Sequence, residues 1–242
     1  MFIKYLLLFF NTGLYLLFYY PKLIYYSLRK DHISKEKRYN FVMKLVKKVS
    51  KGFKANITIE GLENIPSGNN IVFVPNHQSI LDPCFLPYID KTCFAISKKE
   101  CEHYPYFKHI ERCIDALYLD REDIRQAFRT LKVATNQMKE NDDNMLIFLE
   151  GKVTLNEDKK MNEFKPGGLK PAYKNQSSIV PIAINGFYNC VHAKYNKNGY
   201  DCKVRILKPL YYEDYKDIKT VDLAIALHDE IEKNVIELRK EG

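Results

Sequence analysis

The stretch IVFVPNHQSILDP, residues 71–83, determines how the rest of the sequence is interpreted. Its first five residues form a short apolar run of the kind that becomes a buried strand. His77 and Asp82 follow directly. An Asp can orient and charge a His imidazole, which then takes a proton from a hydroxyl group. We therefore expect these two residues to form a catalytic dyad just beyond the end of the strand.

The spacing of this pair restricts its geometry. On one regular helix, a separation of five residues turns two side chains about 140° apart, so they could not touch. His77 must then lie on the turn after the strand, and Asp82 must begin the next element. The Asp82-Pro83 dipeptide fits, because proline is favoured in the first turn of a helix. A structural turn without a catalytic role would use the same residues.

Short apolar runs alternate with amphipathic segments along the rest of the chain. Strands are expected at residues 57–60, 71–74, 93–96, 117–119, 145–148, 179–184 and 204–207. Helices are expected over residues 122–140 and 220–239. Strands interleaved with helices predict an α/β fold, a mixed sheet flanked by helices.

Both helices have a predicted inward face. In the first it comprises Ile124, Phe128, Leu131, Thr135 and Met138, and in the second Leu223, Leu227, Ile231 and Leu238. Residues 155–165 are polar and charged, which predicts an exposed loop.

The net charge of +8 is distributed unevenly. Residues 1–54 carry 12 Lys and Arg against 2 Asp and Glu, a net charge of +10, whereas residues 55–242 carry a net charge of −2. Positive charge beside a hydrophobic N-terminus suits an anionic membrane surface better than a nucleic acid. We therefore expect an N-terminal membrane-associated helical segment, residues 1–54, followed by an α/β domain, residues 55–242.

Residues 2–28 are mainly Leu, Phe, Tyr and Ile, and no charge occurs between residues 5 and 20. This run is short for a full span, which takes about 20 apolar residues. No small-residue cleavage site follows it, so we expect a retained anchor that spans or re-enters the bilayer. Residues 35–53 predict an amphipathic helix with a basic face. The positive flank favours the cell membrane as location, with the catalytic domain on the cytoplasmic side.

The cysteines predict neither a metal site nor disulfides. None of the six lies in a Cys-x-x-Cys pair, and no His stands at a ligand spacing from a pair of them. Free thiols in a reducing compartment are the preferred interpretation.

Three further segments carry polar residues at strand ends. FLEGKVT, residues 148–154, ends a strand with Glu150, Gly151 and Lys152, which can surround an anionic group. LYLDR, residues 117–121, brings Asp and Arg to the head of a helix. IVPIAI, residues 179–184, would wall the site. Taken singly, each is also explained as a turn, a helix cap or a core strand.

Together these segments resemble the glycerolipid acyltransferase family, the 1-acyl-sn-glycerol-3-phosphate acyltransferases. The family's first motif, Asn-His-x-Ser-x-x-Asp, is matched by residues 76–82. Its second, third and fourth motifs resemble residues 118–121, 148–154 and 180–184, and a Lys-containing segment between the first two resembles residues 97–100. The resemblance covers residues 56–190, and four motifs in the right order are far more specific than any one.

The resemblance implies a membrane-bound enzyme of phospholipid biosynthesis that moves a fatty acyl group from a thioester to the free hydroxyl of lysophosphatidic acid, giving phosphatidic acid. His77 and Asp82 would be catalytic. The substrate-binding residues would be Asn76, Ser79, Lys98, Arg121, Glu150, Gly151 and Lys152, with Asn76 and Ser79 shaping the turn. Acyl-CoA or an acylated carrier protein would be the co-substrate. Because a thiolate leaves readily, no metal or other cofactor is expected.

Departures from the third motif leave the acceptor open. Lys152 and Val153 stand where the family has Thr and an Arg thought to hold the acceptor's phosphate. Lys binds phosphate as a point charge, whereas Arg grips it with two donors. Glu-Gly-Lys-Val is similar to the tafazzin branch, so a lysophospholipid acyltransferase or transacylase in phospholipid remodelling is an alternative, as is a non-catalytic membrane-binding homologue. In the second motif, Asp115 stands where the family usually has Gly.

Overall fold

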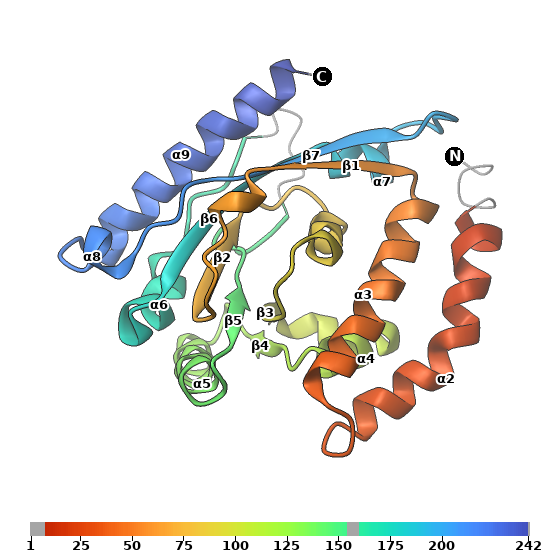
Figure 1. Cartoon of the computed structure of the whole chain (residues 1–242), viewed down its shortest axis with the longest axis horizontal. Helices are drawn as coiled ribbons and strands as arrows, with labels where there is room; N and C mark the ends of the chain where they lie inside the picture. Colours follow the sequence, from red (N-terminus) through yellow and green to blue (C-terminus); the bar gives the residue numbers. More distant parts are fainter. Residues whose placement is uncertain (1–7, 154–159, 242) are drawn as a thin grey trace.

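The computed structural model describes residues 8–153 and 160–241 as one mixed sheet with helices on both faces (Figure 1). In these ranges the strand order is β1-β7-β6-β2-β5-β3-β4. All neighbouring strands are parallel except β6 and β7, which are antiparallel. The bounds are β1 Ala55–Glu60, β2 Ile71–Pro75, β3 Cys93–Lys98, β4 Leu117–Leu119, β5 Asn144–Leu146, β6 Ser178–Asn185 and β7 Tyr200–Ile206. The predicted α/β fold with a mixed sheet is confirmed, and each predicted strand overlaps an observed one.

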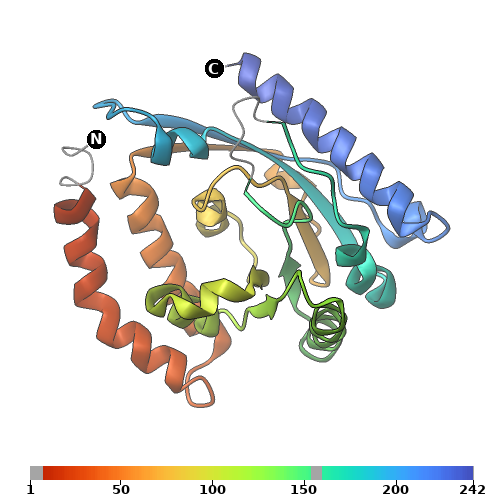
Figure 2. The same cartoon turned by 180° about the vertical axis from the view of Figure 1, so that it is seen from behind.

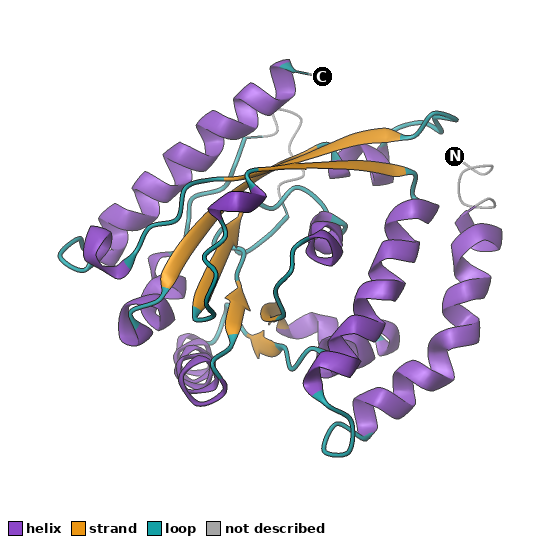
Figure 3. Cartoon of the chain, viewed as in Figure 1, coloured by secondary structure: helices purple, strands orange, loops and turns teal. Residues whose placement is uncertain are grey.

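The helices form two layers around the sheet (Figures 2 and 3). The layer that includes the N-terminal helices consists of η1 Phe9–Gly13, α2 Leu14–Leu28, α3 Lys35–Gly52, η3 Asp82–Tyr88, α4 Pro105–Cys113 and α7 Phe187–His192. The opposite layer consists of α5 Ile124–Asn141, η5 Pro166–Leu169, α6 Lys170–Asn175, α8 Tyr212–Tyr215 and α9 Thr220–Lys240. Two short 3₁₀ turns complete the described chain: η2 Leu62–Asn64 lies between β1 and β2, and η4 Lys99–His103 leads from β3 to α4.

The central strand β2 shows why its sequence is continuously apolar. All five of its residues are buried. Ile71 and Phe73 belong to the core cluster under α2 and α3, whereas Val72 and Val74 belong to the cluster under α5 and α9. Successive side chains of a strand point to opposite faces, and both faces of this sheet are covered. Residue 76 therefore emerges from the most deeply buried strand, at its carboxyl end.

The predicted inward face is confirmed for one of the two helices and is partly wrong for the other. Helix α9 buries Leu223, Leu227, Ile231 and Leu238 as expected. Helix α5 buries Leu131 and Met138, but Ile124 and Phe128 are 83% and 57% exposed, so their predicted inward orientation is wrong. The buried residues of α5 are Thr130, Leu131, Ala134 and Met138, and none of residues 124–129 is buried.

The N-terminal helices are continuous with the core. The amphipathic helix expected over residues 35–53 is confirmed as α3, and its Val42 and Leu45 join the same hydrophobic cluster as Ile71 and Phe73 of β2. The predicted boundary after residue 54 therefore falls within one packed core. In the described part of the chain, no helix is long and apolar enough to cross a bilayer, and residues 2–7 of the expected anchor lie outside that part.

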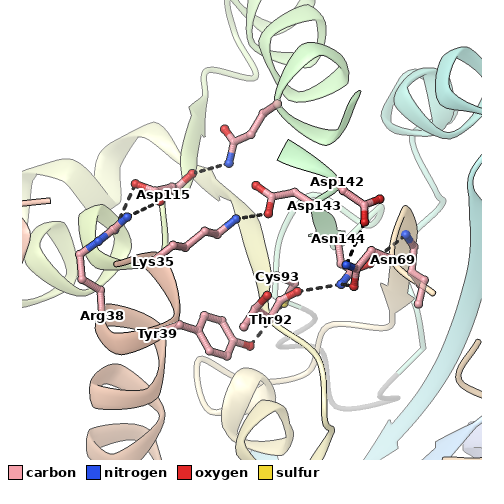
Figure 4. A network of polar contacts seen from close by, with 12 residues as sticks. Lys35, Arg38, Tyr39, Asn69, Thr92, Cys93, Asp115, Asp142, Asp143 and Asn144 are labelled. Atoms are coloured by element: carbon pink, nitrogen blue, oxygen red, sulfur yellow. Dashed lines mark hydrogen bonds and ion pairs between the residues drawn. The ribbon is translucent and has the colours of Figure 1, made fainter. Parts of the chain in front are cut away.

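Polar contacts also tie α3 to the sheet (Figure 4). The buried Arg38 guanidinium pairs with the Asp115 carboxylate at 2.8 Å and donates to the carbonyl oxygen of Cys113 at 2.6 Å. Lys35 forms an ion pair with Asp143. Burial raises the pKa of Asp115, but Arg38 and Lys30 outweigh it, so the net pKa is lowered and the carboxylate stays ionised.

Asp115 itself occupies a special backbone position. Its φ angle is 54°, in the left-handed region where the family's Gly has no steric cost. Asp tolerates this region better than most residues, and here the ion pair with Arg38 holds it in place. The Gly-to-Asp departure noted in the sequence is therefore accommodated locally.

Leu45→Ala is expected to lower the free energy of unfolding by about 2–5 kcal/mol, because Leu45 is 1% exposed within the shared core. Urea denaturation of the two proteins measures this difference. Lys44→Ala, on the exposed face of the same helix, is the control and should change it by less than about 0.5 kcal/mol. If Leu45→Ala left the free energy of unfolding unchanged, α3 would not contribute to the stability of the α/β domain.

Candidate active site

The His77–Asp82 pair forms as the sequence indicated. Nδ1 of His77 lies 2.8 Å from Oδ2 of Asp82. His77 stands on the turn that follows β2, and Asp82 begins η3. Because an ionised carboxylate only accepts hydrogen bonds, Nδ1 carries the proton and Nε2 is left to accept one. Asp82 is fully buried, whereas the His77 side chain is 17% exposed, so the imidazole is the reachable member of the pair.

Asp82 also organises the turn between the two residues. Its Oδ2 accepts hydrogen bonds from the backbone N–H groups of Gln78 at 2.6 Å and Ser79 at 2.9 Å. The Ser79 hydroxyl in turn accepts from the N–H of Leu81 at 3.2 Å. The same carboxylate thus holds the imidazole and curls the chain that connects the two residues.

Asn76 secures this turn to the neighbouring strand. Its side-chain amide donates to the carbonyl oxygen of Ile184 at 3.0 Å and accepts from the N–H of Ile184 at 2.7 Å. Both Asn76 and Ser79 are buried. These contacts give the two residues the turn-shaping role that the resemblance implied, and they direct both side chains toward the backbone.

Glu150 connects the first motif to the third. It is 2% exposed, and its Oε1 accepts the backbone N–H of His77 at 2.6 Å. Its Oε2 accepts the backbone N–H and the side-chain amide of Asn162 at 2.7 and 3.0 Å. Glu150 therefore positions the catalytic turn through two oxygens that both have internal partners. Its predicted part in substrate binding stays a prediction.

Asn162 and Phe164 lie in the segment that was expected to be an exposed loop. Asn162 is half-buried against Glu150, and Phe164 is 7% exposed. The exposed-loop prediction is therefore wrong for these residues, and residues 154–159 lie outside the described part. The polar composition of the segment gave no sign that it packs against Glu150. Phe164 is the one apolar residue between Met161 and Lys165.

Phe148 supports the imidazole from one side. The two rings stack, with centroids 4.1 Å apart and an interplanar angle of 28°. Such a contact limits rotation of the imidazole. The sequence placed Phe148 in the third motif without assigning it this contact.

Arg121 of the second motif lies against Gly151 of the third. Gly151 has a φ angle of +77°, and a Cβ atom at that position would lie 3.5 Å from Nε of Arg121. The guanidinium therefore passes directly over the glycine that follows Glu150. Burial lowers the pKa of Arg121, Glu100 opposes this effect, and Arg remains charged in proteins.

The predicted lysines lie nearer the surface. Lys98 ends β3 beside Leu119 of β4 and pairs with Glu100 at 2.9 Å, with both side chains at least half exposed. Lys152 is exposed. Asp120 of the second motif accepts from Lys99 at 2.9 Å, while Asp123 caps α5, so the cap is three residues later than the sequence suggested.

Cys84 follows Asp82 by two residues but is unsuited to act as a nucleophile. Burial, with the charge of Asp82 adding to it, raises the pKa of this thiol to about 12. The thiolate is the nucleophilic form of cysteine, and it is scarce at such a pKa. Cys84 is therefore no candidate nucleophile, and the described residues contain no cluster of three or more metal-ligating side chains.

A protein-family model described as Acyltransferase matches residues 56–185, which span all four motifs. The chain belongs to the acyltransferase family. The 1-acyl-sn-glycerol-3-phosphate acyltransferase of Saccharomyces cerevisiae is 27% identical over 178 residues, covering 73% of this chain and 58% of that protein. The enzyme of the same name from Haemophilus influenzae is 26% identical over 173 residues, covering 70% of each chain.

The fold of this acyltransferase is shared with a solved structure. The crystal structure of the 1-acyl-sn-glycerophosphate acyltransferase PlsC from Thermotoga maritima superposes with a TM-score of 0.75 at 24% identity. The match covers 98% of this chain and 95% of that one, so it includes the N-terminal helices as well as the sheet.

Glu150→Gln is expected to reduce the kcat of this acyltransferase by about tenfold or more, because an amide nitrogen would face an N–H donor and leave one hydrogen bond unmade. Steady-state kinetics measure kcat and the KM for the acceptor separately. Glu163→Gln, exposed in the loop that contacts Glu150, is the matched control. A raised acceptor KM with unchanged kcat would instead assign Glu150 to direct substrate binding.

Proposed function

We propose that this acyltransferase transfers a fatty acyl group from a thioester to the free hydroxyl of lysophosphatidic acid and so makes phosphatidic acid. The observation that carries the proposal is the 2.8 Å contact between His77 and Asp82, in a chain whose named relatives are 1-acyl-sn-glycerol-3-phosphate acyltransferases. A buried carboxylate paired with a reachable imidazole suits proton removal from an alcohol.

The reaction needs no acyl-enzyme. Nε2 of His77 takes the proton of the acceptor hydroxyl, and Asp82 stabilises the imidazolium that forms. The acceptor oxygen attacks the thioester carbonyl, and a tetrahedral intermediate results. Its collapse forms the ester and releases the thiolate, which takes the proton from His77. Stacking on Phe148 keeps the imidazole in one orientation while it accepts and returns the proton.

The acceptor's phosphate would be held by Arg121, with Lys98 and Lys152 adding positive potential. Support comes from Arg121, whose guanidinium lies over Gly151 beside the catalytic turn. A planar guanidinium can grip a phosphate with two donors, as the family's missing third-motif Arg would. Arg121 can therefore bind the phosphate with two donors at once, whereas Lys152 offers only a point charge.

Purified protein should acylate lysophosphatidic acid from acyl-CoA or an acylated carrier protein, and His77→Ala should reduce the rate by about 10²–10⁴-fold because the base is lost. Product formation from labelled donor measures both. His32→Ala, exposed between α2 and α3, is the control and should be unaffected. A His77→Ala enzyme with near wild-type activity would contradict the mechanism.

A parallel reaction with lysophosphatidylcholine tests the acceptor. Transfer confined to lysophosphatidylcholine would place the protein in the phospholipid-remodelling branch and overturn the assignment of phosphatidic acid as product. Lipid binding without turnover of any acceptor would indicate a non-catalytic homologue.

Helix α2 is the part proposed to contact the cell membrane, with the catalytic domain on the cytoplasmic side. Its outer face exposes Leu14, Leu17, Phe18, Tyr25 and Leu28, and the basic face of α3 lies beside it. Apolar side chains on one face with nearby cations suit an anionic bilayer surface.

Replacing both Leu17 and Phe18 with Ser should weaken sedimentation with vesicles that contain phosphatidylglycerol, because these side chains are 65% and 77% exposed and can enter the bilayer. Ile225→Ser is the control, since Ile225 is 56% exposed on α9, across the sheet from α2 (Figure 1). Equal sedimentation of all three proteins would contradict the proposed contact.

A further inference from the structure

A stripe of positive side chains lies along the outer face of α5. Arg125, Arg129 and Lys132 follow one another at helical spacing, and all three are exposed. They lie opposite Ala134, which is fully buried against the sheet. Arg129 approaches Asp123 at 4.0 Å, and within the described residues no ion pair holds Arg125 or Lys132. The stripe is thus available to an anionic partner.

Two large apolar side chains lie along one edge of this stripe. Ile124 is 83% exposed, and Phe128, one turn later, is 57% exposed. The ammonium group of Lys170 on α6 lies 5.4 Å from the Phe128 ring centroid, which adds a further cation at the edge. Exposed aromatic and aliphatic residues among arginines are typical of protein–protein contact surfaces. We call residues 124, 125, 128, 129, 132 and 170 the α5 surface.

The α5 surface begins at the catalytic end of the sheet. Arg121, three residues before α5, lies over Gly151. Gly151 follows Glu150, which binds the backbone N–H of His77. A partner bound along the first turns of α5 could therefore present a tethered group to the dyad without crossing the molecule.

The arrangement favours a protein over a bilayer. A helix that lies in a membrane surface centres its apolar residues on the contacting face and places its cations at the flanks. On α5 the order is reversed, because the cations occupy the centre of the exposed face and Ile124 and Phe128 occupy one edge. The outward apolar face of α2 also belongs to the opposite layer of the sheet (Figure 2).

The charge of the surrounding domain makes the surface selective. Residues 55–242 carry a net charge of −2, so the cations of α5 stand out within a domain that is close to neutral. Within this nearly neutral domain an acidic protein would be attracted to the α5 stripe, and such local complementarity sets the position and rate of docking.

We propose that the α5 surface docks an acidic protein that carries the acyl group as a thioester and delivers it to His77. This inference rests on the proposed function, since it names the form in which that reaction receives its donor.

The test compares two donors on the same enzyme. The double variant Arg125→Glu/Arg129→Glu reverses two charges of the stripe. With acylated acyl carrier protein as donor, its KM for the donor should rise about tenfold or more, because like charges would then meet across the contact. With acyl-CoA, kcat and KM should change less than about twofold, because the catalytic residues are untouched. Lys233→Glu/Lys240→Glu on the exposed side of α9 is the control of equal charge change.

Ile124→Ser/Phe128→Ser removes the apolar part without changing charge and should show the same dependence on the donor. Binding of the carrier protein to immobilised enzyme gives a second measurement that does not require turnover, and both double variants should weaken it.

Three results would overturn the proposal. The first is that Arg125→Glu/Arg129→Glu loses activity equally with both donors. The second is that the wild-type enzyme uses acyl-CoA but neither uses nor binds the carrier protein. The third is a loss of vesicle sedimentation in Arg125→Glu/Arg129→Glu with unchanged use of the carrier protein, which would assign α5 to the bilayer. In each case the wild-type enzyme would still transfer the acyl group from acyl-CoA, which supports the proposed function. Failure of the docking proposal can therefore be told apart from failure of the proposed function.

Discussion

One oxygen atom, Oδ2 of Asp82, organises the catalytic turn. It accepts from the imidazole of His77 and from two consecutive backbone N–H groups. The other oxygen, Oδ1, is buried and accepts no hydrogen bond from the described residues. A buried, half-satisfied carboxylate costs stability, and the surrounding β2, β6 and η3 must hold it in place. The deeply apolar β2 and the side-chain clamp of Asn76 on β6 supply that rigidity.

The site is assembled from four segments that the sheet brings to one edge. The turn after β2 supplies His77. Glu150, in a turn four residues beyond the end of β5, binds the backbone N–H of His77, and the segment before α5 supplies Arg121. Asn162 then closes on Glu150 from a later segment. The parallel arrangement explains this convergence, because the carboxyl ends of neighbouring parallel strands open on the same side of the sheet. The side-chain pair of His77 and Asp82 is thereby held in place largely by hydrogen bonds to backbone groups.

The sequence was informative wherever a local pattern decided the structure. Short apolar runs located the strands, and the five-residue spacing of His77 and Asp82 required the turn that is observed. Contacts between segments that are distant in the sequence could not be predicted from local patterns. Nothing local to Asn162 signals that it binds Glu150, and the helical period of Ile124 and Phe128 could not show that these two side chains stay exposed. The partnership of Arg38 with Asp115, 77 residues away, likewise depends on the completed fold.

The strand order carries a consequence for how the chain folds. β1 joins the sheet through β7, which lies between β1 and β6. Residues 55–60 thus have no strand partner until residues 200–206 have been synthesised, with 145 residues separating paired positions such as Ala55 and Tyr200. Helices α2 and α3 need not wait for this step, because η3 and α4, against which they pack, are complete by residue 113. Pairing over such a separation is slow, so β1 stays without a strand partner while the helices around it can already assemble.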